Sequence, residues 1–382
     1  MNKMTSRERV LAAARHEPVD RLPVMLWVEP HAMLKMSQGA VRPSNPAVRF
    51  LFDGIENVKN ALPEGQARGA TPFLTYLCAV DYLSQLGTDI VEFSWFDPLT
   101  YIKAVRLDNG KIVAKDVYGV ERSMMGLYLE VSKVPCATPE ELDRYKFPHL
   151  SNRGLYEGIK LFKKTHPGLA VAVDVPGIQD VSQWFMGMEN LYMWMALYPD
   201  VIKRFFEKFL LHTIELTKGI MQAGADIITI LDDYGAQKRM LISKRMWEEF
   251  SFPCLKRQCE EVHRRGGVVM LHSCGYVQPL LGGIVDAGVD IIQSFQPAAG
   301  NDFRTAKAEF GDRICFATGI DSQTLGGKTP AEVRESILES VSIGAPGGGY
   351  ILATNHALQV DAPDENIKAL FDTLEEIKAN RY

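Results

Sequence analysis

The feature that most constrains the fold of this chain is a series of eight short apolar runs, most of them separated by segments long enough for a helix. Each run is too brief for a helix and lacks the alternation of a half-exposed strand, as expected when both faces of a strand are covered. The runs are Leu22–Val28, Asp89–Phe93, Leu169–Val173, Asp226–Leu231, Gly267–Leu271, Asp290–Ser294, Arg313–Ala317 and Gly349–Ala353. We therefore predict an α/β protein with a (β/α)8 (TIM) barrel, and keep a doubly wound open sheet as the alternative because periodicity does not reveal closure.

Three capping boxes mark helix starts outside these runs. Thr5, Thr138 and Thr329 are each followed three residues later by Glu, so each predicts a helix N-terminus, and the first predicts an N-terminal helix. Residues 100–136 break the rhythm with short strand-like segments and turn residues, which predicts a small β-rich insertion on the barrel. No linker or low-complexity tract interrupts the chain, so residues 1–382 are expected to form a single domain.

Composition excludes several classes of partner. The 42 Lys and Arg against 47 Asp and Glu give a net charge of −5, which leaves no positive field to hold nucleic acid. No stretch approaches the roughly 18 to 20 apolar residues of a membrane span. The charged first residues do not resemble an export signal, and six Cys without a Cys-x-x-Cys pair indicate reduced thiols. We expect a soluble cytoplasmic protein.

His272 and Cys274 form the most informative local motif. Residues i and i+2 of an extended strand end point to the same side, so imidazole and thiol can converge at the mouth of the barrel. Zn²⁺ accepts mixed nitrogen and sulfur ligands, and a catalytic zinc keeps three protein ligands. His356 is the leading candidate for the third ligand, with Glu29 and Asp233 as substitutes; the alternative is a hydrogen-bonded His beside a buried thiol.

Asp232 and Asp233 follow the fourth run as a pair. Neighbouring side chains on a strand point in opposite directions, so one carboxylate is expected to face the mouth while the other caps a helix or forms an ion pair. The carboxylate that faces the mouth is a candidate for acid–base chemistry or for binding a substrate hydroxyl. A salt bridge to Lys238 or Arg239 is the competing interpretation.

Further polar and aromatic residues follow the strand ends, where barrel enzymes carry their functional groups. Trp95 and Phe96 come directly after the second run and are expected to line a pocket for a flat or apolar ligand. Glu29, Tyr234 and Gln296 complete the predicted set of substrate contacts. Helix capping is the alternative for acidic residues at such positions, among them Asp97, Asp174 and Asp321.

Together these motifs resemble the uroporphyrinogen decarboxylase superfamily over nearly the whole chain. The resemblance is carried by Thr5–Ala14, Pro18–Pro23, Asp232–Gln237, His272–Gly275, Gly319–Asp321, Gly347–Leu352, Asn355, His356 and Pro363–Ile367. It implies a (β/α)8 barrel, in agreement with the count of runs. Porphyrinogen decarboxylases of this superfamily carry an arginine-rich segment after the first strand, whereas Leu26–Lys35 contains no Arg to receive substrate carboxylates.

The branch of zinc-dependent methyltransferases that work with a corrinoid protein is similar to this chain at His272 and Cys274. Members that methylate coenzyme M use a Cys where this sequence has His356. The resemblance implies an enzyme of O-demethylation, which moves a methyl group from a small methylated compound, expected to be a methoxylated aromatic, to the Co(I) of a corrinoid (cobalamin) protein, with zinc as Lewis acid. Asp233 would position a ring hydroxyl.

Three alternatives remain open at this point: a methylcobamide-to-thiol methyltransferase, a divergent decarboxylase, and a non-catalytic corrinoid- or metal-binding protein. The expected partners are the small methyl donor and the corrinoid protein, with a homodimer as one option for the assembly.

Overall fold

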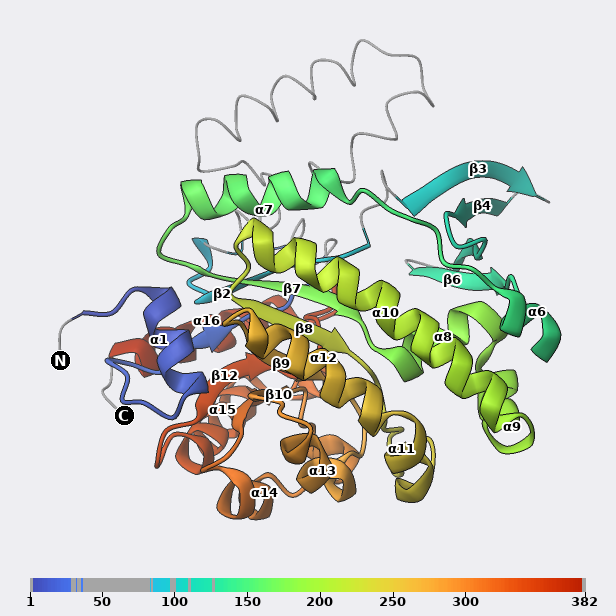
Figure 1. Cartoon of the computed structure of the whole chain (residues 1–382). Coiled ribbons are helices and arrows are strands. Elements are labelled where there is room, and N and C mark those ends of the chain that lie inside the picture. Colours follow the sequence, from blue (N-terminus) through green and yellow to red (C-terminus); the bar gives the residue numbers. More distant parts are fainter. Residues whose placement is uncertain are drawn as a thin grey trace, which may run out of the picture.

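Eight parallel strands close a barrel in the computed structural model of the chain (Figure 1). The structure describes residues 3–28, 32, 36, 83, 85–96, 101–108, 111–125 and 128–379. Around the barrel the strands follow the order β1-β12-β11-β10-β9-β8-β7-β2. They are β1 (Val24–Met25), β2 (Ile90–Phe93), β7 (Ala170–Pro176), β8 (Ile227–Leu231), β9 (Val268–His272), β10 (Ile291–Gln293), β11 (Cys315–Ile320) and β12 (Tyr350–Thr354). Each of the eight predicted runs supplies one strand, which confirms the predicted fold and rules out the open sheet.

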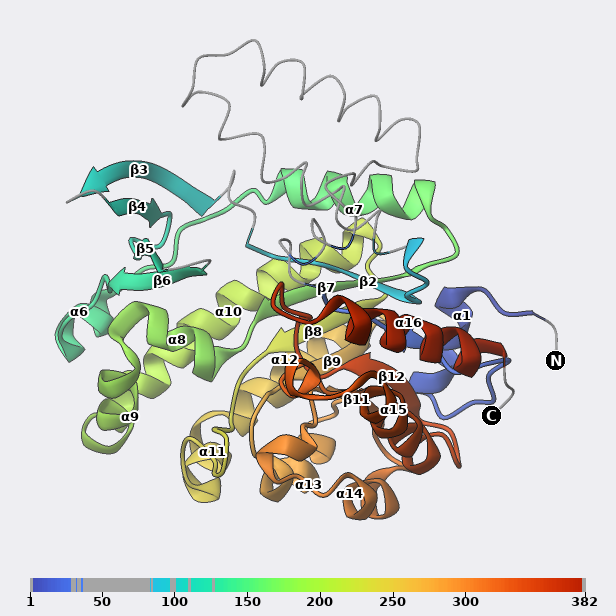
Figure 2. The ribbon, with the colours of Figure 1, turned by 180° about the vertical axis from the view of Figure 1, so that it is seen from behind.

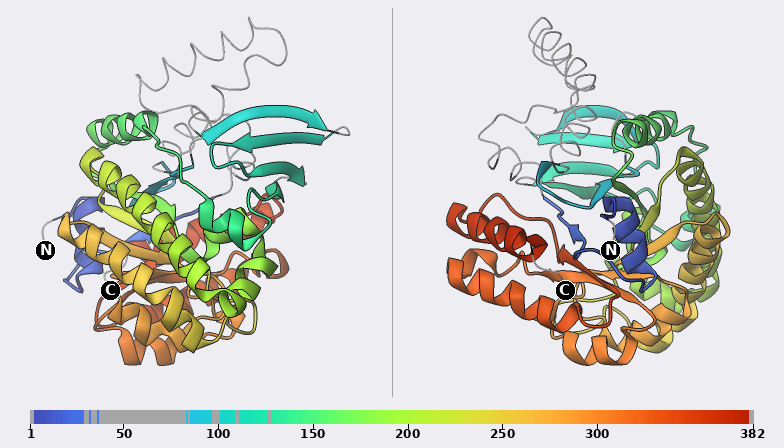
Figure 3. Two further views of the ribbon diagram at one scale, coloured as in Figure 1. Left: turned by 45° about the vertical axis from the view of Figure 1, so that its right-hand side comes forward. Right: turned by 90° about the vertical axis from the view of Figure 1, so that its left-hand side faces the viewer.

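Helices surround the strands, as the right-hand view of Figure 3 shows. They are α1 (Ser6–Ala14), α6 (Pro139–Arg144), α7 (Arg153–Thr165), α8 (Ile178–Met186), α9 (Met188–Leu197), α10 (Pro199–Ala223), α11 (Lys244–Phe250), α12 (Phe252–Arg264), α13 (Leu281–Asp286), α14 (Phe303–Phe310), α15 (Pro330–Gly344) and α16 (Asp364–Ala379). The capping boxes predicted at Thr5, Thr138 and Thr329 are all formed, at the starts of α1, α6 and α15. No helix in the described part of the chain is long and apolar enough to cross a membrane.

The interior of the barrel is apolar toward the amino ends of the strands. Inward-facing side chains of the strands pack there on one face of α1, which covers this end of the barrel. The cluster includes Val10, Ala13, Met25, Ile90, Ala172, Ile227, Met270, Ile291, Ala317 and Ile351. The N-terminal helix is therefore part of the barrel core, because its apolar face has no other place to be buried.

An antiparallel sheet lies at the other end of the molecule from the two termini (Figures 1 and 2). Its strands are β3 (Ile102–Asp108), β4 (Lys111–Asp116), β5 (Glu121–Met125) and β6 (Tyr128–Lys133). The sequence predicts strands at 112–114, 118–120 and 127–131, with turns at 108–110 and 118–119. The first and last strands form in β4 and β6 and the turn at 118–119 is present, whereas the strand at 118–120 is wrong; residues 109, 110 and 127 lie outside the described residues. Asp116 accepts hydrogen bonds from the backbone N–H groups of Tyr118 and Val120, which holds this segment in a turn before β5.

A buried ion-pair network fixes α1 to the barrel. Asp89 is fully buried at the start of β2, where one carboxylate oxygen accepts from Arg9 and the other from Arg21. The same carboxylate accepts the backbone N–H of Val24 at 2.9 Å, which joins β1 to β2. Arg9 also pairs with Asp20.

Replacing Arg9 by Met is expected to lower the free energy of unfolding by about 3–5 kcal/mol, because it leaves the buried Asp89 without one of its two guanidinium partners. Urea unfolding followed by circular dichroism measures this loss. Arg334→Met is the control, since Arg334 pairs with Glu376 on the surface, where such a pair contributes less than about 1 kcal/mol. Equal losses in the two variants would contradict the importance of the network.

Candidate functional site

A polar layer follows the apolar interior at the carboxyl ends of the strands. On several strands, the residue two positions after an apolar core residue points to the same interior face of the barrel and is polar. The five polar residues are Glu92, Asp174, Thr229, His272 and Gln293. The change from apolar to polar therefore occurs at the mouth, the end at which barrel enzymes place their chemistry.

Asp233, His272 and Cys274 converge at this mouth. One ligand atom from each residue lies within 4.8 Å of the other two. Asp233 Oδ1 is 3.8 Å from His272 Nε2 and accepts the backbone N–H of Cys274 at 2.7 Å. Ligands of a tetrahedral zinc with bonds of about 2.0–2.3 Å lie about 3.5 Å apart, so small adjustments would place these three atoms around one ion. The donor set of nitrogen, sulfur and oxygen fits Zn²⁺.

A hydrogen bond fixes the orientation of the His272 ring. Nδ1 contacts the carboxamide oxygen of Gln293, which only accepts, so Nδ1 carries the proton. The Gln293 carboxamide in turn donates to the backbone carbonyl of Thr354 at 2.9 Å, which keeps its oxygen toward His272. Nε2 is therefore unprotonated in the neutral ring and faces Asp233, as a metal-ligating imidazole requires. The sequence placed Gln293 at a strand end but gave it no role.

His356 lies near the three residues but is not one of them. Its ring centroid is 6.2 Å from that of His272, and its ring stacks on Trp27 at 4.9 Å. Burial lowers the pKa of His356, and the nearby His272 lowers it further, whereas Asp233 acts in the opposite direction. Among the described residues Asp233, one of the two substitutes, has a ligand atom that converges with those of His272 and Cys274, and His356 does not. The other substitute, Glu29, lies outside the described residues, as does Asp97.

The pair Asp232 and Asp233 divides as strand alternation predicts. Asp232 is buried. Its carboxylate accepts hydrogen bonds from the backbone N–H groups of Asp180, at 2.7 Å, and of Gln179, and thereby caps the N-terminus of α8. Burial raises the pKa of Asp232 to about 7, although its hydrogen-bond donors act in the opposite direction. Within the described residues, neither Lys238 nor any other Lys or Arg forms an ion pair with either carboxylate.

A third carboxyl group, that of Asp180, lies beside Asp232 and Asp233. Burial raises the pKa of Asp180 well above its usual range, and the nearby Asp233 and Asp232 raise it further. Burial also raises the pKa of the Cys274 thiol, as does Asp233. A divalent cation would relieve this repulsion, and its binding would release the thiol proton.

Two predicted substrate contacts are engaged elsewhere. Tyr234 is fully buried, its hydroxyl donates to Asp232 at 2.8 Å, and its ring packs on Trp247, so it supports the helix cap instead of facing the mouth. Gln296 is also buried, and its carboxamide oxygen accepts the backbone N–H of Gly275 at 2.8 Å. Gln296 thus holds the loop that carries Cys274. The sequence could not show this, because position at a strand end does not fix where a side chain turns.

Glu92 and Asp174 form a pair of carboxyl groups in the polar layer. Burial raises the pKa of both groups, and the proximity of Glu92 raises that of Asp174 further. Asp174 accepts the backbone N–H of Trp95 at 2.6 Å. From its place at a strand end, Asp174 is expected either at the mouth or as a helix cap, whereas Glu92 has no predicted role because it lies inside a strand. Its place two residues after Ile90, on the inward face, was the available signal.

The predicted pocket aromatics belong to a larger cluster beside the mouth. Trp95 contacts Phe96, Tyr101, Tyr118 and Trp184, with ring centroids 5.1–6.2 Å apart. Trp95 is 3% exposed, whereas Phe96 and Trp184 are partly exposed. Phe96 and Trp184 therefore present the accessible surface of the cluster, and Trp95 supports them.

Two glycines bring the loops after β8 and β9 into backbone contact. Gly275 has φ +77°, and a Cβ on it would lie 2.5 Å from the carbonyl carbon and oxygen of Gly235. A Cβ on Gly235 would lie 2.5 Å from the backbone nitrogen of Tyr276. Because one loop carries Asp233 and the other Cys274, this contact sets the spacing between two of the candidate ligands.

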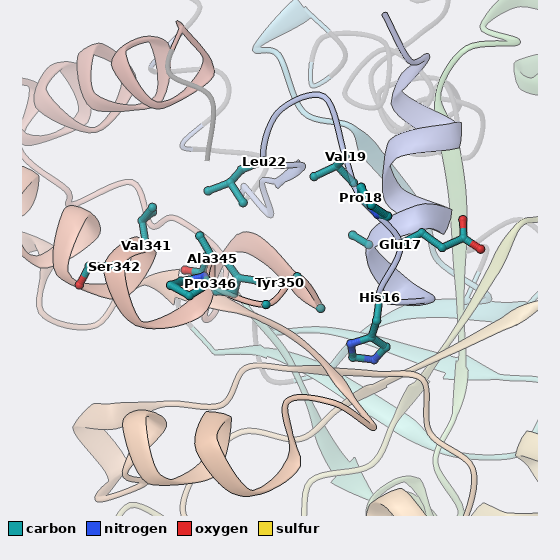
Figure 4. A pocket seen from close by; sticks show the side chains of 14 residues that line it. His16, Glu17, Pro18, Val19, Leu22, Val341, Ser342, Ala345, Pro346 and Tyr350 are labelled. Atoms are coloured by element: carbon teal, nitrogen blue, oxygen red, sulfur yellow. The ribbon is translucent and has the colours of Figure 1, made fainter. Parts of the chain in front are cut away.

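A cavity of about 420 Å³ lies at the opposite end of the barrel (Figure 4). It is enclosed by the segment after α1, including His16 and Pro18, and by the glycine-rich loop that leads into β12, with Pro346 and Tyr350. Its lining is largely apolar and it lies at the amino ends of the strands, so it is separate from the mouth.

Residues 116–377, more than half of the chain, match the family described as uroporphyrinogen decarboxylase (URO-D). The chain belongs to the uroporphyrinogen decarboxylase family. Relatives with this name include one from Anaeromyxobacter dehalogenans (strain 2CP-C), 26% identical over 96% of this chain and 97% of its own length. The chain is also 24% identical, over 99% of its length and all of the relative, to a methylcobamide:CoM methyltransferase, MtaA, from Methanosarcina barkeri.

Among solved structures, a methyltransferase from Methanosarcina mazei matches 98% of this chain and 99% of its own with a TM-score of 0.68 and 20% identity. That likeness supports the barrel fold of this uroporphyrinogen decarboxylase family member. The resemblance inferred from motifs is thus confirmed. Relatives in the family are methyltransferases or decarboxylases, and both are enzymes.

Gly275→Ala is expected to weaken zinc binding at least about tenfold. The new methyl group separates the loops that carry Asp233 and Cys274. Losing a contact that holds metal ligands in place typically lowers metal affinity by about 10- to 100-fold. Competition with a chromogenic chelator measures the affinity. Gly187→Ala is a matched control, since Gly187 has φ +83° but nothing lies within 4 Å of its Cβ position. Equal affinities in the two variants would show that the contact does not set the spacing.

The raised pKa of Asp174 predicts how stability depends on pH in the metal-free protein. A carboxyl group with a raised pKa in the folded state contributes fully at low pH, and its contribution falls as pH rises above the unfolded value of about 3.9. Asp174→Asn stays neutral, so its free energy of unfolding should decline less than that of the native protein from pH 5 to 8. Urea unfolding at each pH measures the slope, with the exposed Glu335→Gln as control. A slope unchanged in Asp174→Asn would contradict the shift.

Proposed function

We propose that this protein is a zinc- and corrinoid-dependent methyltransferase. It moves a methyl group from a small methylated compound, a methoxylated aromatic, to the Co(I) of a corrinoid carried by a partner protein in the cytoplasm. The observation that carries the proposal is the convergence of Asp233, His272 and Cys274 at the barrel mouth, with the His272 ring oriented by Gln293. The methylcobamide methyltransferase among its relatives supports the same class of reaction.

The site fits a catalytic zinc in three respects. Its donors are one imidazole nitrogen, one thiol sulfur and one carboxylate oxygen, which leaves a coordination position for substrate. The side chain of Asp233 is 32% exposed, so the centre is open to the mouth. Burial and mutual repulsion raise the pKa values of the nearby carboxyl groups of Asp180 and Asp232, and a bound cation would favour their ionised forms.

The chain's own residues bind and orient the methyl donor in this proposal. The partly exposed rings of Phe96 and Trp184 hold the aromatic ring by stacking. The carboxylate oxygen of Asp233 that does not bind the metal positions a ring hydroxyl of the donor. The bound zinc supplies a Lewis acid that stabilises the negative charge on the oxygen that loses its methyl group. The methyl–oxygen bond breaks as the electron pair of Co(I) forms the cobalt–carbon bond, and the released oxyanion takes up a proton.

Two other reactions are the competing outcomes. Transfer in the opposite direction, from methyl-Co(III) to the sulfur of a thiol, with Co(I) and a proton released, would make the protein a methylcobamide-to-thiol methyltransferase, the class of activity named for the Methanosarcina barkeri relative. A decarboxylase would release CO2 without added corrinoid, the activity named for the Anaeromyxobacter dehalogenans relative. The absence of Arg from Leu26–Lys35 disfavours the second reaction on a substrate with many carboxylates.

The test mixes the purified protein with reduced cobalamin and a panel of methoxyaromatics and acids, and in a second series with methylcobalamin and thiols, and follows Co(I) and methyl-Co(III) by absorption. We expect one zinc per chain and formation of methyl-Co(III), both lost in His272→Ala and in Cys274→Ser. Cys254→Ser is the matched control, because Cys254 lies on α12 and bonds to the carbonyl of Phe250. Full activity of a metal-free protein, or CO2 release without corrinoid, would refute the proposal.

The third ligand is decided by a second pair of variants. Asp233→Ala is expected to lower zinc affinity at least about tenfold, and His356→Ala to change it less than about threefold, because Asp233 belongs to the group of converging atoms. The opposite ranking would restore His356 as the ligand.

A further inference from the structure

Arg122 is a buried guanidinium with one unused hydrogen-bonding group. The residue is 5% exposed and lies on β5 of the antiparallel sheet. Its Nη1 bonds to Asp116, whose other oxygen accepts two backbone N–H groups, so this carboxylate is fully engaged. Nη2 has no hydrogen-bond partner among the described residues. A buried charged donor without an acceptor is expensive, and such groups are retained where a ligand completes them.

The surroundings of Arg122 are the aromatic rings assigned above to the methyl donor. Its guanidinium carbon lies 4.5 Å from the ring centroid of Trp184 and 5.0 Å from that of Phe96. Both rings are partly exposed, unlike Arg122 itself. The two rings therefore cover the guanidinium, and a ligand that reaches Nη2 has to take the place of one of them while it stacks on the other.

The position of Trp184 links this guanidinium to the candidate metal centre. Trp184 and Asp180 are four residues apart on α8, so they lie on one face of the helix, about 6 Å apart along its axis. The backbone N–H of Asp180 donates to Asp232 at 2.7 Å, and Asp232 directly precedes Asp233. Trp184, on which the guanidinium stacks, thus lies on the face of α8 that also carries Asp180, beside the candidate metal ligands.

We propose that Arg122 selects methoxylated aromatic compounds that carry a carboxylate, by donating N–H groups of Nη2 to it. This inference rests on the proposed function and adds the substrate class. A carboxylate reaches Nη2 when Phe96 or Trp184 turns aside, and it then satisfies the donor that is unpaired in the free protein. The methoxy group of such a ligand points away from Arg122, toward Asp233 and Cys274. The pattern of the barrel strands does not predict a binding role for Arg122, because Arg122 comes from the insertion and not from a barrel strand.

Equilibrium binding without corrinoid tests the proposal independently of turnover. The probes are 4-methoxybenzoate and its neutral match 4-methoxybenzamide, titrated against the tryptophan fluorescence of the zinc-loaded protein. The native protein should bind the carboxylate about 10- to 100-fold more tightly, as expected for a hydrogen bond between charged groups. Arg122→Met should abolish this preference, and Arg122→Lys should retain only part of it, because Lys lacks the planar fork.

Arg106→Met is the matched control, on strand β3 of the same sheet. Arg106 pairs with Glu121 at 2.8 Å and is half exposed, so its removal should leave the preference unchanged. If Arg122→Met does not fold, the double variant Asp116→Asn, Arg122→Met removes both buried charges and is used in its place.

The outcomes separate this proposal from the proposed function. Equal binding of the two probes by the native protein, or an unchanged preference in Arg122→Met, overturns the role of Arg122 even if methyl transfer occurs. A preference for the carboxylate that is lost in Arg122→Met supports it, even if no methyl reaches cobalt, in which case the proposed function alone fails.

Discussion

In a closed barrel of parallel strands, successive side chains must alternate between the interior and the surrounding helices. Every functional feature of this protein follows from where that alternation changes from apolar to polar. Ile291 packs in the core and Gln293, two residues later, orients His272, which occupies the same level on the neighbouring strand. The barrel therefore builds the support for the site with the same periodicity that builds its core, and needs no additional element to do so.

The barrel was predictable because its strands are buried on both faces and its helix starts carry strong capping residues. Those patterns are local, so eight runs and three capping boxes were enough to establish the order of elements. The insertion was harder to predict. Tyr118 and Val120 have the composition of a strand, but the carboxylate of Asp116 binds their N–H groups and makes a turn. The hydrogen bonds that the Asp116 side chain accepts therefore outweigh the predicted strand at residues 118–120.

Residues of the candidate site were predictable only where their side-chain direction follows from the alternation along a strand. This alternation placed His272 beside Cys274 and set Asp232 and Asp233 on opposite sides, and the structure shows that geometry. Whether a residue just past a strand turns into the mouth depends on loops that pack on one another, as for Tyr234 and Gln296, and local pattern carries no information about such contacts. The neighbours of His356 and Arg122 likewise come from distant parts of the chain.

The two sides of the mouth come from separate stretches of sequence. Residues 232–293 contain Asp233, His272, Cys274 and Gln293, whereas residues 92–184 contain the aromatic cluster and Arg122. Each stretch is continuous, and the two meet mainly across α8 and the strands β7 and β8. Under the proposed function, changes within the earlier stretch can alter which methyl donor is accepted while the later stretch retains the candidate metal ligands. A barrel divided in this way can acquire new donors in evolution without rebuilding its reactive centre.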